Sequence, residues 1–397
     1  MSMRETKECQ LEYMLSEREM AIAASTRIGI IGGGQLGLMT AEAARAMGYA
    51  GVAVLDPTPQ CPASIVAEQI VGSLKDPQAI RQLASRSDIL TYEIEHINTD
   101  ALQALQAEGA KIYPSPDLLA IIQNKYQQKE FLAQHAIPVV PFMSIDSVAD
   151  IEHAAQLWGY PLVLKAKKDA YDGRGNARID EPGNIASALA KLGDRELYVE
   201  KGLDLAKEIG LMIARNERGD IVTHPVVEMI HARNICQVVL APASIDLSLQ
   251  AEAQEIAHRT IGYLEGVGIF GFEFFLDTAG KIWLNEIAPR PHNLGHYTIE
   301  ACKTSQFTQH LRAITNLPLT ATDMLYPAAV MINILGDRDG PADPYWLEDY
   351  DPDNVFVHIY GKRETKIDRK MGHITVVGDD LYQIYAHAQE VRAALSI

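Results

Sequence analysis

The feature that most limits the fold is a repeated unit in the first part of the chain, where an apolar strand, a turn and a helix follow one another. The predicted strands are residues 27–31, 52–55, 89–92 and 111–113. The predicted helices between them are residues 36–47, 77–86 and 99–108. Apolar strands that alternate with helices are typical of a parallel sheet covered on both faces. The sequence therefore predicts an α/β domain at residues 27–116.

The rest of the chain has a different pattern. A helix at 117–135 precedes a helix at 147–157, a strand at 161–165 and a run of strands with few helices. The later strands are predicted at 197–200, 208–214, 221–228, 238–241, 269–276 and 281–287, with helices at 249–264 and 305–316. This pattern predicts an α+β domain at 117–319 with a largely antiparallel sheet. A small β-rich subdomain is predicted at 320–397, and residues 1–26 are expected to be a helical or disordered extension.

Charge and composition exclude several classes of function. The net charge of −17 argues against nucleic acid or an anionic membrane as the main partner, because both require a basic surface. No apolar run is long enough for a membrane span, and acidic residues interrupt the apolar stretches near the N-terminus. The four cysteines form no C-x-x-C pair, so neither a zinc site nor a disulfide framework is indicated. A cytoplasmic location is expected.

A glycine-rich turn follows the first strand. Gly32-Gly33-Gly34-Gln35-Leu36-Gly37 matches G-x-G-x-x-G, and Asp56 stands at the end of the next predicted strand, directly after Leu55. This pattern favours an NAD-dependent oxidoreductase as one hypothesis. The alternative is a tight turn in a doubly wound sheet, with the helix N-terminus facing another ligand.

The strongest chemical signal is a predicted hairpin formed by residues 271–277 and 281–287. If the turn is centred between Ala279 and Gly280, Glu273 and Glu286 lie directly opposite each other on one face. Opposed carboxylates destabilise a strand pair unless a cation lies between them. Together with the Asn285 amide they suit Mg²⁺, which proteins hold with one or two carboxylates and substrate phosphates. The alternative is a solvated hairpin, which the surrounding aromatic residues disfavour.

Three further stretches carry polar groups suited to phosphates and oxyanions. Ala288-Pro289-Arg290-Pro291-His292-Asn293 leaves the hairpin, and its arginine is a natural fork for bicarbonate or a phosphate anhydride. The loop Tyr171-Asp172-Gly173-Arg174-Gly175-Asn176 follows the strand that ends at Lys165 and is typical of a lid over phosphates. Glu200-Lys201-Gly202-Leu203 ends a strand near Glu208 and could meet adenine and ribose.

The order of these motifs resembles the ATP-grasp superfamily. In combination, G-G-G-Q-L-G, Y-D-G-R-G, N-E-I-A-P-R-P-H-N and the segment ending in Lys370-Met371-Gly372-His373 are similar to one family, the 5-(carboxyamino)imidazole ribonucleotide synthases. The resemblance extends from about Arg27 to the C-terminus. It implies an ATP-grasp fold with three domains, the first of them Rossmann-like, and a homodimer. It also implies Mg²⁺, two ions expected, and ATP-dependent carboxylation of aminoimidazole ribonucleotide with bicarbonate in purine biosynthesis.

The resemblance also implies roles for residues that bind the nucleotide and the metals. Glu273 and Glu286 would bind the metals. The residues that would contact ATP are Lys125, Lys165, Tyr171, Asp172, Gly173, Arg174, Gly175, Asn176, Glu200, Lys201, Gly202, Leu203, Glu208, His231, Asn285 and Glu286.

The remaining implied roles concern the two other substrates. Bicarbonate or its phosphorylated form would meet Arg290, His292 and Asn293. Asp172 would orient or deprotonate the amine, with His292 as a competing proton carrier. The ribonucleotide would be bound by Gln35, Tyr171, Arg174, Lys362 and Arg369.

Two departures from the family pattern stand out. Leu38 replaces an arginine after G-Q-L-G, which puts one phosphate or ribose contact in doubt. Asp169 and Ala170 replace glycines before the lid, which could stiffen it. Other ATP-grasp ligases remain alternatives, such as a formate-dependent glycinamide ribonucleotide transformylase or a biotin-dependent carboxylase, although no biotin-attachment segment is seen. The NAD-dependent oxidoreductase hypothesis leaves Glu273, Glu286 and Arg290 without a function.

Overall fold

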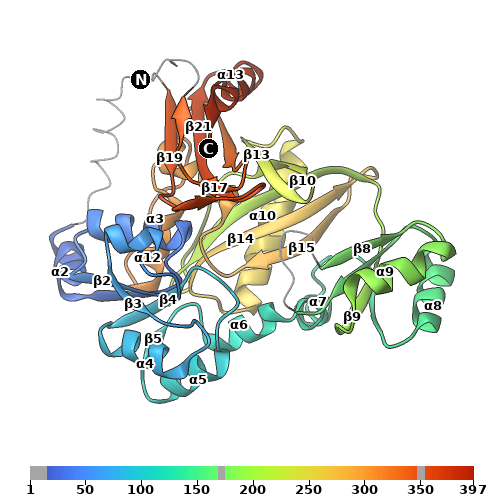
Figure 1. Ribbon diagram of the computed structural model, residues 1–397, viewed down its shortest axis with the longest axis horizontal. Coiled ribbons are helices and arrows are strands. Elements are labelled where there is room, and N and C mark those ends of the chain that lie inside the picture. Colours follow the sequence, from blue (N-terminus) through green and yellow to red (C-terminus); the bar gives the residue numbers. More distant parts are fainter. Residues whose placement is uncertain (1–15, 169–174, 347–353) are drawn as a thin grey trace.

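The computed structural model of the chain describes residues 16–168, 175–346 and 354–397 (Figure 1). The N-terminal part is a five-stranded parallel sheet with the order β3-β2-β1-β4-β5, as the strand–helix alternation predicts. Its elements are β1 (Arg27–Ile31), α3 (Gln35–Ala46), β2 (Gly51–Asp56), η1 (Pro62–Ile65), β3 (Glu68–Val71), α4 (Pro77–Ser85), β4 (Ile89–Tyr92), α5 (Thr99–Ala107) and β5 (Lys111–Ile112). The edge strand β3 was not predicted, because it is short and begins with the polar residues Glu68 and Gln69.

The described part of the N-terminal extension is helical. Helix α2 (Glu17–Ser25) begins at Ser16, whose side chain and that of Glu19 form a reciprocal capping box. Ala23 is buried in the cluster under α3, and Glu19 forms an ion pair with Arg312 of the distant helix α12. The helix therefore packs against the body of the protein.

The helix predicted at 117–135 is broken at one residue. Asn124 ends α6 (Pro116–Gln123) and begins α7 (Lys125–Gln134), where its side-chain oxygen accepts hydrogen bonds from the backbone N–H groups of Tyr126 and Gln127. Asparagine is among the preferred N-cap residues, so its side chain favours the start of a new helix here over one continuous helix. The break makes Lys125 the first residue of α7.

A small lobe contains a four-stranded antiparallel sheet with the order β6-β9-β7-β8. Two of its strands, β6 and β8, were not predicted from the sequence. The elements are β6 (Phe142–Ile145), α8 (Val148–Trp158), β7 (Leu162–Ala166), β8 (Asn176–Ile179), η2 (Pro182–Asn184), α9 (Ile185–Leu192) and β9 (Leu197–Lys201). Figure 1 shows this lobe in green, projecting from the central body.

The largest sheet has nine strands among the described residues, with the order β15-β14-β10-β12-β13-β16-β21-β19 and β11 beside β10. Its pairs are antiparallel, as predicted. The strands are β10 (Leu205–Arg215), β11 (Ile221–Thr223), β12 (Val227–Ala232), β13 (Ile235–Ala241), β14 (Gly268–Asp277), β15 (Ile282–Ala288), β16 (Ala328–Leu335), β19 (Val355–Ile359) and β21 (Lys370–Gly378). Because β13 pairs with β16, the C-terminal strands β16, β21 and β19 extend the central sheet.

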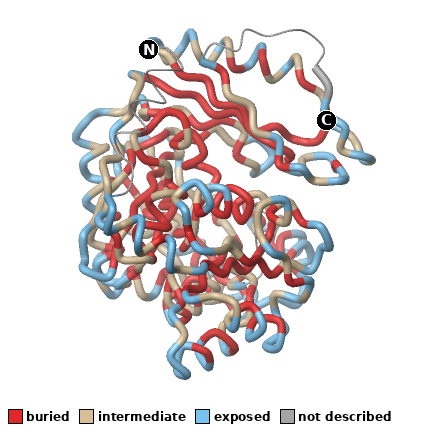
Figure 2. Tube along the Cα trace, turned by 90° about the vertical axis from the view of Figure 1, so that its left-hand side faces the viewer, coloured by how far each residue is buried: buried red, intermediate tan, exposed pale blue. Residues whose placement is uncertain are grey.

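Helices and short strands complete the fold. They are α10 (Leu247–Tyr263), η3 (Asn293–Gly295), α11 (Thr298–Ala301), α12 (Gln306–Ile314), β17 (Gly340–Pro341), β18 (Tyr345–Trp346), β20 (Glu364–Thr365), α13 (Leu381–Ala393) and β22 (Leu395–Ser396). Figure 2 shows buried chain running along the sheet strands, with exposed chain at the periphery.

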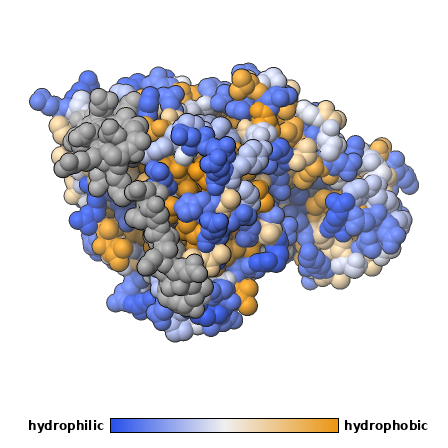
Figure 3. All heavy atoms as spheres, turned by 90° about the horizontal axis from the view of Figure 1, so that it is seen from above, coloured by the Kyte–Doolittle hydropathy of each residue, from blue (hydrophilic) through white to orange (hydrophobic). Residues whose placement is uncertain are grey.

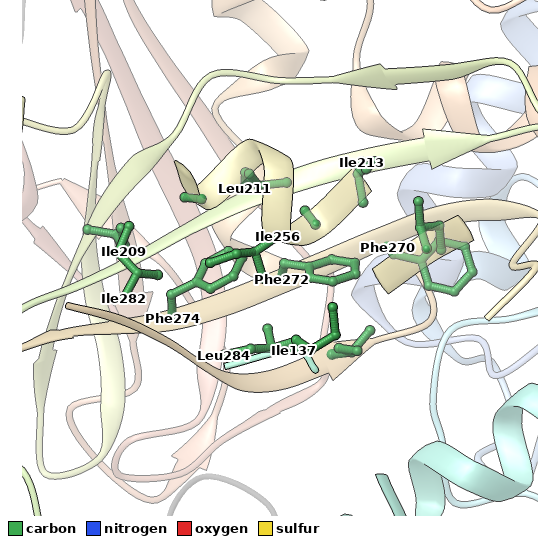
Figure 4. Packing of buried hydrophobic residues seen from close by; sticks show 14 of the residues in the cluster. Ile137, Ile209, Leu211, Ile213, Ile256, Phe270, Phe272, Phe274, Ile282 and Leu284 are labelled. Carbon is green, nitrogen blue, oxygen red and sulfur yellow. The ribbon is translucent and has the colours of Figure 1, made fainter. Parts of the chain in front are cut away.

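The core that supports the hairpin lies between the large sheet and α10. Phe270, Phe272 and Phe274 alternate along β14 and pack with Ile256 and Leu211 (Figure 4). Burial of each such side chain contributes about 1.5–3 kcal/mol. Since side chains alternate along a strand, Glu273 between two of these phenylalanines faces the opposite side.

Within the described ranges no helix has both the length and the apolar character needed to cross a bilayer. On the face seen from above, hydrophobic groups are interrupted by hydrophilic ones (Figure 3).

Candidate active site

A cavity of about 410 Å³ opens where the parts of the fold meet. It is lined by Glu95 after β4, Lys125 of α7, Lys165 of β7, Glu273 of the hairpin and Lys370 of β21. The cavity therefore gathers charged groups of both signs from segments far apart in the sequence.

The two hairpin carboxylates lie directly opposite each other, as predicted. Glu273 pairs with Glu286 across β14 and β15. The register was not the simple one, since near the turn Phe274 pairs with Leu284 and a bulge at Asn285 restores the Glu273–Glu286 pairing. The bulge aims two successive residues of β15, Asn285 and Glu286, at the cavity.

The electrostatics of this pair differ between its members. Burial and the neighbouring charge of Glu286 raise the pKa of Glu273 to about 7. Burial also disfavours the ionised form of Glu286, but Lys125 outweighs it and lowers its pKa. The Lys125 Nζ lies 3.1 Å from both Glu286 oxygens. The charge of Glu286 is thus neutralised by Lys125. Among the described residues, no lysine or arginine forms an ion pair with Glu273.

Glu200 has a different environment from the one expected of a ribose ligand. Its two oxygens lie 2.8 Å from the Lys129 Nζ and 2.7 Å from the Lys165 Nζ, and its side chain is 3% exposed. Burial opposes ionisation, but these two lysines outweigh it and lower the pKa of Glu200 to about 2. The carboxylate therefore holds the lysines in place and does not line the cavity.

Lys129 is a site residue that the sequence reasoning missed. It lies four residues after Lys125 on α7, so the two lysines share one face of the helix. That spacing was the signal that could have identified it.

The strand end expected to read adenine has some of its backbone groups already bonded. The N–H of Lys201 donates to the carbonyl of Pro141, and that of Gly202 donates to the carbonyl of Pro161. Recognition of adenine here would therefore use the carbonyls of these residues and the backbone of Leu203. Nearby, the Nδ1 of His231 lies 3.1 Å from the Oε2 of Glu208, and both residues line the cavity.

The loop after the hairpin is held at each polar residue. The Nε of Arg290 lies 2.8 Å from Glu95 of the N-terminal domain. Asn293 exchanges two amide hydrogen bonds with Asn333 of β16, at 2.9 and 2.6 Å. The Asn293 carboxamide is therefore largely used within the protein, which differs from the role of a bicarbonate ligand.

His292 is electrically neutral at physiological pH. Burial, followed by the cationic Arg290 and Lys370, lowers its pKa well below the usual value of histidine. Its Nε2 lies 3.7 Å from the Glu273 Oε1. This environment favours a hydrogen-bonding role for His292 over that of a proton carrier.

Lys362 and Arg369, which were expected to bind the ribonucleotide, do not line the cavity. Burial and then Arg369 lower the pKa of Lys362 to about 8, and its Nζ donates to the carbonyl of Lys370 at 2.6 Å. Arg369 is exposed and donates to the carbonyl of Glu364, whereas its neighbour Lys370 lines the cavity. Side chains alternate along a strand, so the choice between these two residues depended on the orientation of β21.

Other expected residues have mixed outcomes. Gln35 begins α3 and does not line the cavity. Gly175 and Asn176 line it. Tyr171, Asp172, Gly173 and Arg174 lie outside the described residues, as do Asp169 and Ala170.

The glycine-rich turn is filled by the protein's own carboxylates. The backbone N–H groups of Gly34 and Gly37 donate to Glu93 at 2.5 and 2.6 Å, and that of Gly33 donates to Asp56 at 2.9 Å. A dinucleotide pyrophosphate would need these same N–H groups. The geometry thus argues against the NAD hypothesis, and Glu93, at the end of β4, was not identified from the sequence.

Three family models match successive parts of the chain: a ribonucleotide synthetase preATP-grasp domain at 25–123, an ATP-grasp domain at 130–307 and a phosphoribosylaminoimidazole carboxylase C-terminal domain at 329–387. The structure is similar to N5-carboxyaminoimidazole ribonucleotide synthetase from Thermotoga maritima, with a TM-score of 0.84 and 44% identity over 94% of this chain and 99% of that one. The chain belongs to the N5-carboxyaminoimidazole ribonucleotide synthase family.

Two further comparisons extend this assignment. A phosphoribosylaminoimidazole carboxylase from Ogataea methanolica is 42% identical over 367 residues, 90% of this chain and 67% of that protein, so the chain spans about two thirds of its length. A synthase from Aspergillus clavatus, solved with ADP and 5-aminoimidazole ribonucleotide, has a TM-score of 0.84 and 34% identity, over 93% of this chain and 98% of that one.

Membership of the N5-carboxyaminoimidazole ribonucleotide synthase family raises the question of a metal. In the part of the chain that the structure describes, no group of three or more His, Cys, Asp or Glu side chains could hold a metal ion. Glu273 and Glu286 nevertheless fit Mg²⁺, which needs one or two carboxylates when phosphates supply other oxygens. The raised pKa of Glu273 supports this fit, because a cation would favour its ionised form.

Proposed function

We propose that this protein catalyses the ATP-dependent carboxylation of 5-aminoimidazole ribonucleotide with bicarbonate, forming 5-(carboxyamino)imidazole ribonucleotide, ADP and phosphate. The observation that carries this proposal is the Glu273–Glu286 pair facing a cavity that also contains Lys165, Arg290 and His292. The pair suits ATP phosphates with Mg²⁺, and the adjacent arginine suits a small oxyanion. The Aspergillus clavatus complex with ADP and 5-aminoimidazole ribonucleotide supports the same pair of ligands.

Lys125 and Lys165 would hold the ATP phosphates. Both side chains are presented to the cavity by carboxylates, Lys125 by Glu286 and Lys165 by Glu200. Glu208 and His231 would meet the ribose, and Asn285 would lie beside the phosphates. Mg²⁺, when bound at Glu273 and Glu286, would neutralise charge on the transferring phosphoryl group.

Arg290 and His292 would orient bicarbonate for attack on the terminal phosphorus of ATP. The ion pair with Glu95 fixes the Arg290 guanidinium. Because this group is planar and rigid, the directions of its other N–H groups are fixed as well. The neutral His292 would accept a hydrogen bond from the bicarbonate or donate one to it. The amine of the ribonucleotide would then attack the resulting carboxyphosphate, or CO2 released from it, giving the carbamate and phosphate.

The ribonucleotide phosphate would be bound from the C-terminal strands. Lys362 and Lys370 are the described cations suited to it, and Arg369 would require a change of side-chain orientation. Two metal ions, a homodimer, a cytoplasmic location and the lid residues Tyr171, Asp172, Gly173 and Arg174 stay predictions. The lid is expected to exclude water from the carboxyphosphate.

The test is an ADP-release assay with Mg²⁺ and ATP, in which bicarbonate and 5-aminoimidazole ribonucleotide are each present or omitted. Strong stimulation that requires both substrates is the expected result. ADP release that responds instead to glycinamide ribonucleotide and formate would overturn the choice of acceptor. Absence of ADP release under every condition would overturn the proposal.

A further inference from the structure

Gln306, the first residue of α12, is fully buried and forms a clamp on the backbone of His292. Its Oε1 accepts a hydrogen bond from the His292 N–H at 2.8 Å. Its Nε2 donates to the His292 carbonyl at 2.9 Å. Because a backbone N–H only donates and a carbonyl only accepts, these two contacts fix the orientation of the carboxamide.

The second hydrogen of the Gln306 amide also has a partner. Its Nε2 lies 3.1 Å from the Nδ1 of His296, and burial keeps the pKa of His296 well below its usual value. The neutral ring can therefore accept this hydrogen at Nδ1. All the donors of the carboxamide are used within the segment that follows the hairpin.

The clamp fixes the His292 backbone from which the ring extends. A Cβ added at Gly271 would lie only 2.8 Å from the His292 Cβ and 3.0 Å from its Cγ, so the side chain packs directly on β14. The Nε2 is then 3.7 Å from the Glu273 Oε1. A shift of the His292 backbone would change the position of the ring relative to the carboxylate pair.

We propose that Gln306 is a positioning residue for the bicarbonate step, which acts by fixing the His292 backbone while remaining outside the cavity. The inference rests on the proposed function, since it assigns bicarbonate to Arg290 and His292. Misplacement of a reacting group by about 1 Å costs on the order of 100-fold in rate. Loss of the clamp should therefore act mainly on the use of bicarbonate.

The same helix provides a matched control. Gln309 is also fully buried, and its carboxamide clamps the backbone of Thr320 in the same way, accepting from the N–H and donating to the carbonyl. Thr320 does not line the cavity. The two glutamines thus share residue type, burial, helix and the clamp on one backbone residue, but they hold different segments, and the second amide hydrogen goes to His296 in one and to the Thr320 hydroxyl in the other.

The experiment compares Gln306→Met and Gln309→Met in the full chain, with kcat and KM measured separately for bicarbonate, ATP and 5-aminoimidazole ribonucleotide. Both variants should lose thermal stability, because each removes the buried hydrogen bonds from a glutamine to one backbone residue, although the His292 carbonyl keeps its bond from the Gly295 N–H in Gln306→Met. We expect kcat/KM for bicarbonate to fall about 100-fold in Gln306→Met alone. Its KM for ATP should stay within about twofold of wild type.

A second variant, Gln306→Glu, tests the same role if Gln306→Met fails to fold. The ionised side chain would place an oxygen against the His292 carbonyl, whereas the protonated form can donate to it. The ratio of variant to wild-type kcat/KM for bicarbonate should therefore rise as the pH falls.

Equal kinetic constants for Gln306→Met and Gln309→Met, or a pH-independent ratio for Gln306→Glu, would overturn the positioning role. Wild-type enzyme without bicarbonate-dependent ADP release would instead overturn the proposed function.

Discussion

Two regions of the chain combine carboxylates with a turn suited to a nucleotide, and they differ in what the carboxylates meet. In the glycine-rich turn, Glu93 accepts hydrogen bonds from Gly34 and Gly37, so both partners are satisfied by the protein. In the hairpin, Glu273 faces Glu286 and its pKa is raised to about 7. The first region is closed by its own side chain, whereas in the second the carboxylate pair lines the cavity. A motif indicates a binding site only when its polar groups remain available after folding.

The largest effect is expected at the hairpin. Glu286→Gln should reduce ADP formation about 1,000-fold, because it removes a charge that interacts with the transferring phosphoryl group. The assay is ADP release under saturating ATP. The control Glu255→Gln makes the same change at an exposed position of α10 and should be silent. Activity within about tenfold of wild type, with normal folding, would contradict the assignment of the hairpin as the phosphate site.

In the glycine-rich turn, loss of the Glu93 carboxylate should lower the stability of the protein. Glu93→Ala leaves the N–H groups of Gly34 and Gly37 without their acceptor and should lower the free energy of unfolding by roughly 1–3 kcal/mol. Chemical denaturation measures this, with the exposed Gln82→Ala on α4 as control. Saturable binding of a nicotinamide dinucleotide to the wild-type protein would break the comparison, since it would need those same groups.

A buried histidine, His310, joins the strand before Glu93 to the strand that carries Glu273. Its protonation should destabilise the folded protein. His310 bonds Thr91 of β4 at 2.7 Å and accepts from the Ile269 N–H of β14 at 3.1 Å, which requires a neutral ring. Burial lowers its pKa to about 3. The unfolded chain binds a proton near pH 6.5, so stability is full above that pH and decreases below it toward pH 3.

His310 alone should account for about 2 kcal/mol of lost stability between pH 7 and about pH 5. Thermal unfolding across this range should show a steeper pH dependence for wild type than for His310→Gln. The exposed His153→Gln on α8 is the control and should follow wild type. A His310→Gln slope equal to that of wild type would show that the ring takes up its proton at the same pH in the folded and the unfolded chain.

The smallest effect concerns the helix break that delivers Lys125 to the hairpin. Asn124→Ala removes the N-cap of α7 and should cost about 1 kcal/mol of stability. The exposed Gln127→Ala on the same helix is the control. If Asn124→Ala were neutral in equilibrium denaturation, the break between α6 and α7 would have another cause.

Much of the fold could be predicted because it is encoded in local patterns. Runs of apolar residues predicted β1 and β4 to the residue. The short strand β3 could not be predicted, because Glu68 and Gln69 are polar and have little local preference for a strand. Its pairing with β2 stabilises the extended conformation. The break at Asn124 was readable in principle, since an asparagine before a charged, polar run is a typical N-cap.

The candidate site shows the same division. Glu273, Glu286, Arg290 and His292 were identifiable because their chemistry is unusual for a buried hairpin and its adjoining loop. Lys370 was not chosen over Arg369, since adjacent residues differ only in the face to which the strand turns them.

The sequence by itself determined which residue types stand at the hairpin and the glycine-rich turn, and hence what chemistry each could support. Only the tertiary structure decided that Glu93 fills the turn, that a bulge at Asn285 sets the register and that Gln306 holds His292. The physical reason is that local preference depends on neighbours in the chain. Whether a polar group is satisfied depends on partners that are distant in the chain and meet it only after folding.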